Sequence, residues 1–148
     1  MKTELEGRTK ECSIKVIRQV RTFPKTVDGI EVGRQLLRSA VSIGANYREA
    51  NRAESKPDFI HKIGIAEKEA SETVYWLEIC LAAPLGVGDE IRLLLKESNE
   101  LLVIITTIGR KTKGKIRRIP VLTNPAGALA IVMFSLSRFS LFAFHSPL

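Results

Sequence analysis

Residues 29–51 read GIEVGRQLLRSAVSIGANYREAN, a segment without proline in which apolar side chains recur every three or four positions. At about 100° per residue, one face of a helix collects Val32, Leu36, Ala40, Ile43, Tyr47 and Ala50. The opposite face, extended by one residue past this segment, collects Arg34, Arg38, Arg48 and Arg52. The pattern predicts an amphipathic helix with an apolar front and a basic back.

Three further helices follow from the positions of the prolines. We expect the first over residues 9–23, with Ile14, Ile17 and Val20 as its apolar face. The third begins after Ser55, which can cap the free amides, and the fourth begins near Asp89, after the turn LGVG at 85–88. Because the sequence shows no strand pattern up to residue 115, we predict an all-α fold, an antiparallel up-down four-helix bundle.

The third predicted helix carries two apolar groups. The first has helical spacing along one face and consists of Phe59, Ile63, Ala66, Ala70, Val74, Leu77 and Leu81. The second lies well off that face and consists of Ile65, Tyr75, Trp76 and Ile79. A second apolar group favours contact with another subunit, so we predict these four residues as an oligomer interface. The alternative is that this helix is central and is covered on both sides within one bundle.

Composition excludes several classes of protein. The chain has 148 residues, of which 45% are hydrophobic, so it can bury a core and is not disordered throughout. Cys12 and Cys80 lie far apart, which excludes a disulfide scaffold and a structural zinc site. The polar start MKTELE is not a signal peptide, and we predict a cytoplasmic protein with reduced thiols.

The sequence changes character after the predicted bundle, which we assign to residues 1–115. Residues 116–148 contain three arginines, no acid and four of the six phenylalanines, and we treat them as a basic and hydrophobic C-terminal extension. Their apolar run at 126–144 is interrupted by Arg138 and serines, whereas a membrane span needs about 20 apolar residues with few charges. Three interpretations stay open: a loose extension, a segment docked on the bundle or on a neighbouring subunit, and a membrane contact.

The residues that could support catalysis are few. Asp58 and His61 stand three positions apart, but a di-iron bundle needs two such pairs and two more glutamates. The other histidine, His145, lies in the extension. No nucleophile, base and orienting group can be argued together. We therefore predict no enzyme activity, no metal and no cofactor.

Two basic elements predict nucleic-acid binding in a chain whose net charge is +7. The first is the arginine stripe, extended by Lys56 and Lys62. The second is a segment without acids that contains Arg110, Lys111, Lys113, Lys115, Arg117 and Arg118. Guanidinium groups donate two hydrogen bonds to a phosphate, and RNA is the preferred target. The alternative is that the stripe only keeps the helix soluble. Few aromatic side chains accompany it, so base-specific recognition is not expected.

Four segments resemble the small four-helix-bundle proteins encoded in 23S rRNA intervening sequences. They are QLLRSAVSIGANYREA at 35–50, SKPDF at 55–59, IAEKEA at 65–70 and ETVYWL at 72–77. The resemblance covers residues 10–112 and is strongest over 35–81. The opening helix lacks the aromatic and acidic start usual in the family, and the extension has no counterpart there.

The resemblance implies a bacterial four-helix bundle that assembles into a ring, typically a pentamer. It also implies that the polar flank Ser42, Asn46 and Glu49 belongs to the family signature and sets bundle geometry or a subunit contact. It does not supply a function, although a related branch serves as accessory subunit to the reverse transcriptase of retroelements. We therefore carry two hypotheses, an oligomer that binds nucleic acid and a scaffold that binds a protein such as that enzyme. We expect no membrane partner.

Overall fold

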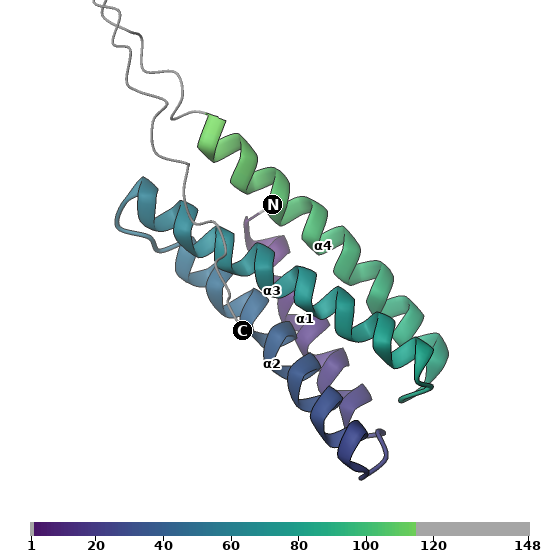
Figure 1. Ribbon diagram of the computed structural model, residues 1–148. Coiled ribbons are helices and arrows are strands. Elements are labelled where there is room, and N and C mark those ends of the chain that lie inside the picture. Colours follow the sequence, from purple (N-terminus) through teal and green to yellow (C-terminus); the bar gives the residue numbers. More distant parts are fainter. Residues whose placement is uncertain (1, 115–148) are drawn as a thin grey trace, which may run out of the picture.

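A computed structural model describes residues 2–114 as four α-helices joined by short turns. They are α1 (Lys2–Val20), α2 (Val27–Ala50), α3 (Lys56–Ala82) and α4 (Gly88–Gly114). Each helix runs antiparallel to the one before it (Figure 1), and α3 packs against both α2 and α4. The predicted all-α four-helix bundle is confirmed. The predicted extension at 116–148 lies outside the described residues.

The helix ends follow from local chemistry. The backbone N–H of Asp58 donates to Oγ of Ser55 at 3.2 Å, so Ser55 caps α3 as predicted, and Pro57 occupies the first turn. Thr26 caps α2 in the same way, because its Oγ1 accepts from the N–H of Gly29 at 3.4 Å. The helix therefore begins at Val27, two residues before the predicted start.

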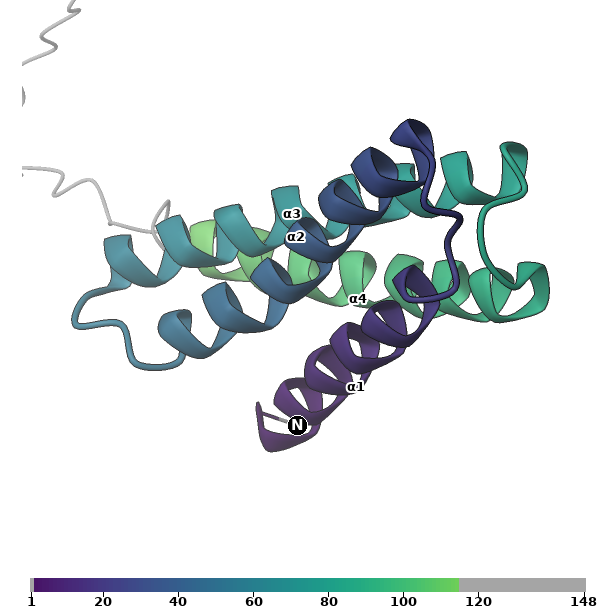
Figure 2. The same ribbon diagram turned by 90° about the horizontal axis from the view of Figure 1, so that it is seen from below.

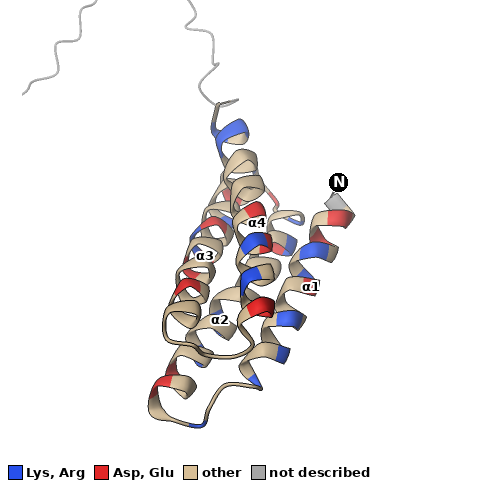
Figure 3. Ribbon diagram, turned by 90° about the vertical axis from the view of Figure 1, so that its right-hand side faces the viewer, with Lys and Arg blue, Asp and Glu red and all other residues tan. Residues whose placement is uncertain are grey.

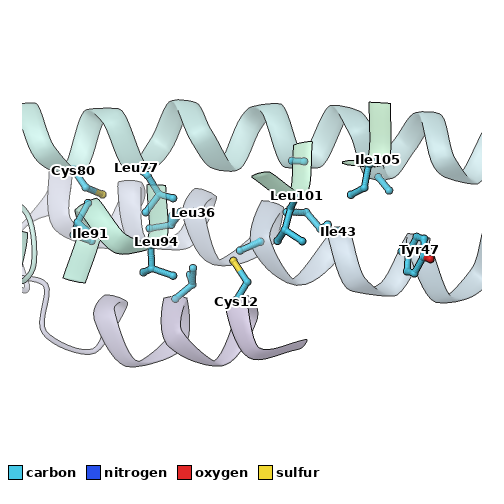
Figure 4. Close-up of a cluster of buried hydrophobic side chains, with 14 of the residues drawn as sticks. Cys12, Leu36, Ile43, Tyr47, Leu77, Cys80, Ile91, Leu94, Leu101 and Ile105 are labelled. Atoms are coloured by element: carbon cyan, nitrogen blue, oxygen red, sulfur yellow. The ribbon is translucent and has the colours of Figure 1, made fainter. Parts of the chain in front are cut away.

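The core lies where the apolar faces of all four helices meet (Figure 4). On α2, five of the six predicted apolar residues are buried, and Val32 packs partly buried against them. Leu36 and Ile43 meet Leu77 of α3 and Leu101 of α4, and each of these side chains is at most 1% exposed. Since each such side chain stabilises the fold by about 1.5–3 kcal/mol on burial, this shared core holds the bundle together.

The predicted first helix was wrong in its start and in its buried face. α1 begins at Lys2, and Ile14, Ile17 and Val20 are only partly buried. The face that is buried instead contains Leu5, Thr9, Cys12, Val16 and Gln19. Two polar members of this face have partners: the hydroxyl of Thr9 donates to O of Glu6, and Oε1 of Gln19 accepts from the N–H of Val87. Because those hydrogen bonds offset the cost of burial, apolar spacing alone selected the wrong face.

Polar side chains also lie between the helices inside the core. Oγ1 of Thr73 on α3 stands 3.0 Å from Oγ of Ser39 on α2, and both residues are fully buried. Sγ of Cys12 on α1 stands 3.8 Å from Oγ of Ser98 on α4. Because these residues are small, the helices can approach closely, and their polar groups are partners for one another across each interface.

The turn between α3 and α4 depends on Gly86. Its φ is +78°, a conformation that residues with a Cβ rarely adopt. A Cβ at this position would lie 2.7 Å from Cε1 of Phe23, a core side chain that follows α1. The turn is therefore packed directly against the start of the α1–α2 connection.

The first turns of α1 run away from the other three helices (Figure 2). The seam between α1 and α4 is closed by Arg8, which donates to Glu97 at 2.9 Å and to Glu100 at 2.8 Å. Among the four described helices, none is long and apolar enough to cross a membrane.

Candidate nucleic-acid interface

The four arginines of the predicted stripe are all exposed: Arg34, Arg38 and Arg48 lie on α2, and Arg52 lies in the turn after it. The two in the first half of the helix form ion pairs. Arg34 contacts Glu31 at 2.8 Å on the same helix, and Arg38 contacts Glu72 of α3 at 3.3 Å. The guanidinium of Arg34 holds the pKa of the Glu31 carboxyl below its usual value, so this pair is fully ionised at neutral pH. These acids reduce the positive potential that a phosphate would meet there.

The other two arginines, Arg48 near the end of α2 and Arg52 in the turn after it, differ from the first two. Within the part of the chain that the structure describes, neither Arg48 nor Arg52 forms an ion pair. Arg48 lines a groove of about 250 Å³ between α1 and α2, and Lys10 and Glu6 of α1 line the same groove. The carboxylate of Glu6 accepts a hydrogen bond from Nδ2 of Asn51. Two cations from different helices therefore flank one surface depression.

The two lysines predicted to extend the stripe lie in different environments. Lys56 is exposed at the turn between α2 and α3. Lys62 is partly buried, and its ammonium donates to the carboxylate of Glu49, which raises the pKa of Lys62. Glu49 belongs to the predicted signature flank. In the same flank, Nδ2 of Asn46 donates to O of Ser42 at 2.9 Å, so both contacts lie within the bundle.

The basic residues at the end of α4 do not share one side. Arg110 lines a groove toward α3, whereas Lys111 lines a groove toward α1. Both side chains and that of Lys113 are exposed, and Lys115 lies outside the described residues. Thr112 and Lys56 line one hollow, which places the end of α4 beside the α2–α3 turn.

The outer side of α1 carries the basic residues that sequence reasoning missed. Its exposed cations are Lys10, Lys15, Arg18 and Arg21. Residues 2–25 contain seven Lys and Arg against three Glu, whereas residues 27–54 contain four of each charge. Figure 3 shows basic residues at successive turns of α1. The excess of positive charge thus belongs to α1, and counting charges segment by segment would have found it.

The predicted oligomer interface is partly covered by the bundle itself. Ile65, Trp76 and Ile79 are partly buried, and only Tyr75 is exposed, at 52%. The rings of Tyr75 and Trp76 meet edge to face, with centroids 5.0 Å apart, and Nε1 of Trp76 donates to Glu72 at 3.3 Å. Because α3 packs on both α2 and α4, the second apolar group owes much of its burial to this bundle.

The remaining reactive groups are either buried or isolated. Burial raises the pKa of the Cys12 thiol, and it raises that of Cys80 to about 11, so neither is a thiolate at neutral pH. His61 is exposed. Across residues 2–114, no group of three or more His, Cys, Asp and Glu side chains could hold a metal ion.

Comparison with known proteins gives a consistent result. The family described as 23S rRNA-intervening sequence protein matches residues 2–107. A crystal structure of a protein with unknown function from the S23 ribosomal protein family of Bacteroides thetaiotaomicron VPI-5482 is 32% identical and superimposes with a TM-score of 0.68. The match covers 74% of this chain and 99% of that one. No curated protein matches.

Proposed function

Because the chain belongs to the family of 23S rRNA-intervening sequence proteins, we propose that it is a non-enzymatic, oligomeric bundle that binds nucleic acid, with RNA preferred. The binding site in this proposal runs along α1 and the turn after it, and continues from Lys10 onto the end of α2 and the turn that follows. We call it the α1–α2 basic surface, and it consists of Lys10, Arg18, Arg21, Arg48 and Arg52.

The observation that carries this proposal is the distribution of ion pairs. Arg34 and Arg38 already face carboxylates, whereas Arg48 and Lys10 line one groove and form no ion pair within residues 2–114. A cation without a carboxylate partner has no ion pair to give up when it contacts a phosphate, and arginine contacts it through two parallel hydrogen bonds. The α1–α2 basic surface is therefore the better site for a phosphate backbone than the predicted stripe as a whole.

The salt dependence of binding follows from the number of cations. If the five cations of the surface each neutralise one phosphate of single-stranded RNA, the slope of log K against log salt is about −3.5. Raising salt from about 50 to 200 mM would then weaken binding roughly a hundredfold. Repetition of the surface in a ring would multiply a weak contact through effective concentration.

The test compares two double variants with the same change of charge, one in the first half of α2 and the other at its end and in the turn that follows. Arg48→Gln with Arg52→Gln should weaken RNA binding and reduce the magnitude of the slope by about 1.4. Arg34→Gln with Arg38→Gln should change the affinity for RNA and the salt slope much less, because those arginines are already in ion pairs. The absence of binding by the wild type at low salt, or equal losses in the two variants, would overturn the proposal.

Assembly into a ring, the pentamer that the family resemblance implies, forms part of the same proposal. The exposed ring of Tyr75 supports a subunit contact on α3. The same exposed ring also favours the second candidate, a protein scaffold such as an accessory subunit to a reverse transcriptase. That candidate predicts that arginine variants keep full function while Tyr75→Ala disrupts the complex. Pull-down with each variant, using the reverse transcriptase as probe, separates the two candidates.

A further inference from the structure

An apolar groove of about 330 Å³ runs between the first turns of α1 and the last turns of α4. Its lining includes Leu5, Tyr47, Val103, Ile104 and Ile108. The groove exists because α1 runs away from α4 toward its N-terminus (Figure 2). Val103, on α4, is 66% exposed, although it is a large apolar side chain.

Three charged residues also line this groove: Glu4, Arg8 and Lys111. Arg8 is held by Glu97 and Glu100 of α4, and Lys111 lies one turn before the end of that helix. The groove therefore combines a mostly apolar lining with a few charged side chains, which is the usual form of a site for an apolar side chain or segment.

We propose that apolar side chains from residues 126–136 of the same chain, AGALAIVMFSL, fill this groove. The segment contains eleven residues, none of them charged. Left in water, such a segment would favour aggregation, so covering it benefits both surfaces. This inference is independent of nucleic-acid binding.

The length of the chain is sufficient for this contact. The described chain ends at Gly114, and the eleven residues 115–125 separate it from the segment. Eleven residues span at most about 40 Å. Val103 and Ile108 lie eleven and six residues before Gly114 on α4, which is about 17 and 9 Å along the helix axis at 1.5 Å per residue. The segment can therefore reach the whole groove.

The tether also favours this occupant over a second copy of the chain. A short linker gives a segment an effective concentration in the millimolar range, whereas a second copy competes at its own concentration in solution.

Photo-crosslinking of the full-length chain tests the proposal. Benzoylphenylalanine placed at Phe134 should crosslink, on irradiation, to the apolar lining contributed by α1 and α4. An equal mixture of isotopically labelled and unlabelled chains shows whether each crosslink joins one chain to itself. Crosslinks within one chain to the groove are expected. Crosslinks to other surfaces, or mainly between chains, would overturn the proposal.

A pair of matched variants on α4 adds a control for surface charge. Val103→Lys should lower the yield of groove crosslinks about tenfold, which corresponds to about 1.4 kcal/mol. Leu93→Lys changes a residue of similar exposure, 63% against 66%, outside the groove and should leave the yield unchanged. Thr107→Lys, also exposed at the groove, provides a second variant with the same expected loss. Equal yields in the groove variants and in Leu93→Lys would refute the docking.

Discussion

Replacing Gly86 with alanine should destabilise the bundle, whereas the same replacement at Gly7 should stabilise it. Gly86 has a φ of +78°, and its added Cβ would lie 2.7 Å from Cε1 of Phe23 and 3.1 Å from Oε1 of Gln19. That oxygen accepts the N–H of Val87, so the clash also disturbs a hydrogen bond. Gly7 lies within α1, and nothing stands within 4 Å of the Cβ it would gain.

The expected changes in the free energy of unfolding differ in sign and in physical cause. A non-glycine residue in the left-handed conformation costs about 1–2 kcal/mol. Displacing a packed core side chain such as Phe23 costs about 1–3 kcal/mol more. Gly86→Ala should therefore lower the free energy of unfolding by about 2–5 kcal/mol. Gly7→Ala should raise it by about 0.5–1 kcal/mol, because alanine favours the helix.

Urea unfolding of the full chain, followed by circular dichroism at one fixed protein concentration, measures both changes. Gly86→Ala should cost less stability in a Phe23→Leu background than in the wild type, because the shorter side chain relieves the clash. If Gly86→Ala unfolds at the same urea concentration as the wild type, the reasoning about this turn is wrong. If the losses of the two single variants simply add, the contact with Phe23 is not the cause.

Three further predictions concern other parts of the molecule. Arg8→Gln should cost about 1 kcal/mol of stability, because Arg8 binds Glu97 and Glu100 across the α1–α4 seam. A double-mutant cycle with Glu97→Gln should give a coupling energy of that size, and a coupling energy near zero would contradict the prediction. Cys80 should resist iodoacetamide at pH 8 in the native protein and react fully in urea. The pKa of Cys80 is about 11 in the folded protein and about 9 in the unfolded chain, so the unfolded chain loses the thiol proton first, and the stability that this group contributes declines as pH rises above 9. Measuring the stability of the wild type and of Cys80→Ala across this pH range tests the effect. Rapid labelling of Cys80 in the native protein would refute the prediction. Tyr75→Ala should weaken assembly without unfolding the chain, as sedimentation velocity and circular dichroism would show, and an unchanged sedimentation coefficient would argue against this interface.

The parts of the fold that follow an apolar period could be predicted from the sequence. On α2 the spacing of Leu36, Ile43 and Tyr47 identified the buried face, because every position on that face except one is buried and its opposite face is charged. The buried face of α1 could not be predicted in this way. Its buried face contains Thr9 and Gln19, whose partners are supplied by the fold, and no pattern of apolar residues marks it.

The ion pairs of the candidate site could likewise be predicted only in part from the sequence. That Arg34 would pair with Glu31 could be seen from their spacing of three on one helix. That Arg38 would pair with Glu72 could not, since 34 residues separate them and only the packing of α2 on α3 brings them together. The sequence therefore identified the basic helix face, whereas the structure was needed to separate its paired arginines from Arg48 and Arg52.

The divergence of α1 from α4 also bears on how the bundle opens. Near Leu5 an open groove lies between the helix and the last turns of α4, whereas near Val16 the helix is enclosed by its neighbours. Backbone amides in the first turns of α1 should therefore exchange hydrogen with solvent by local fraying, at a lower free energy than the amides around Leu36 or Leu101. The first turns of α1 would then act as a leading arm that detaches while the rest of the bundle stays folded.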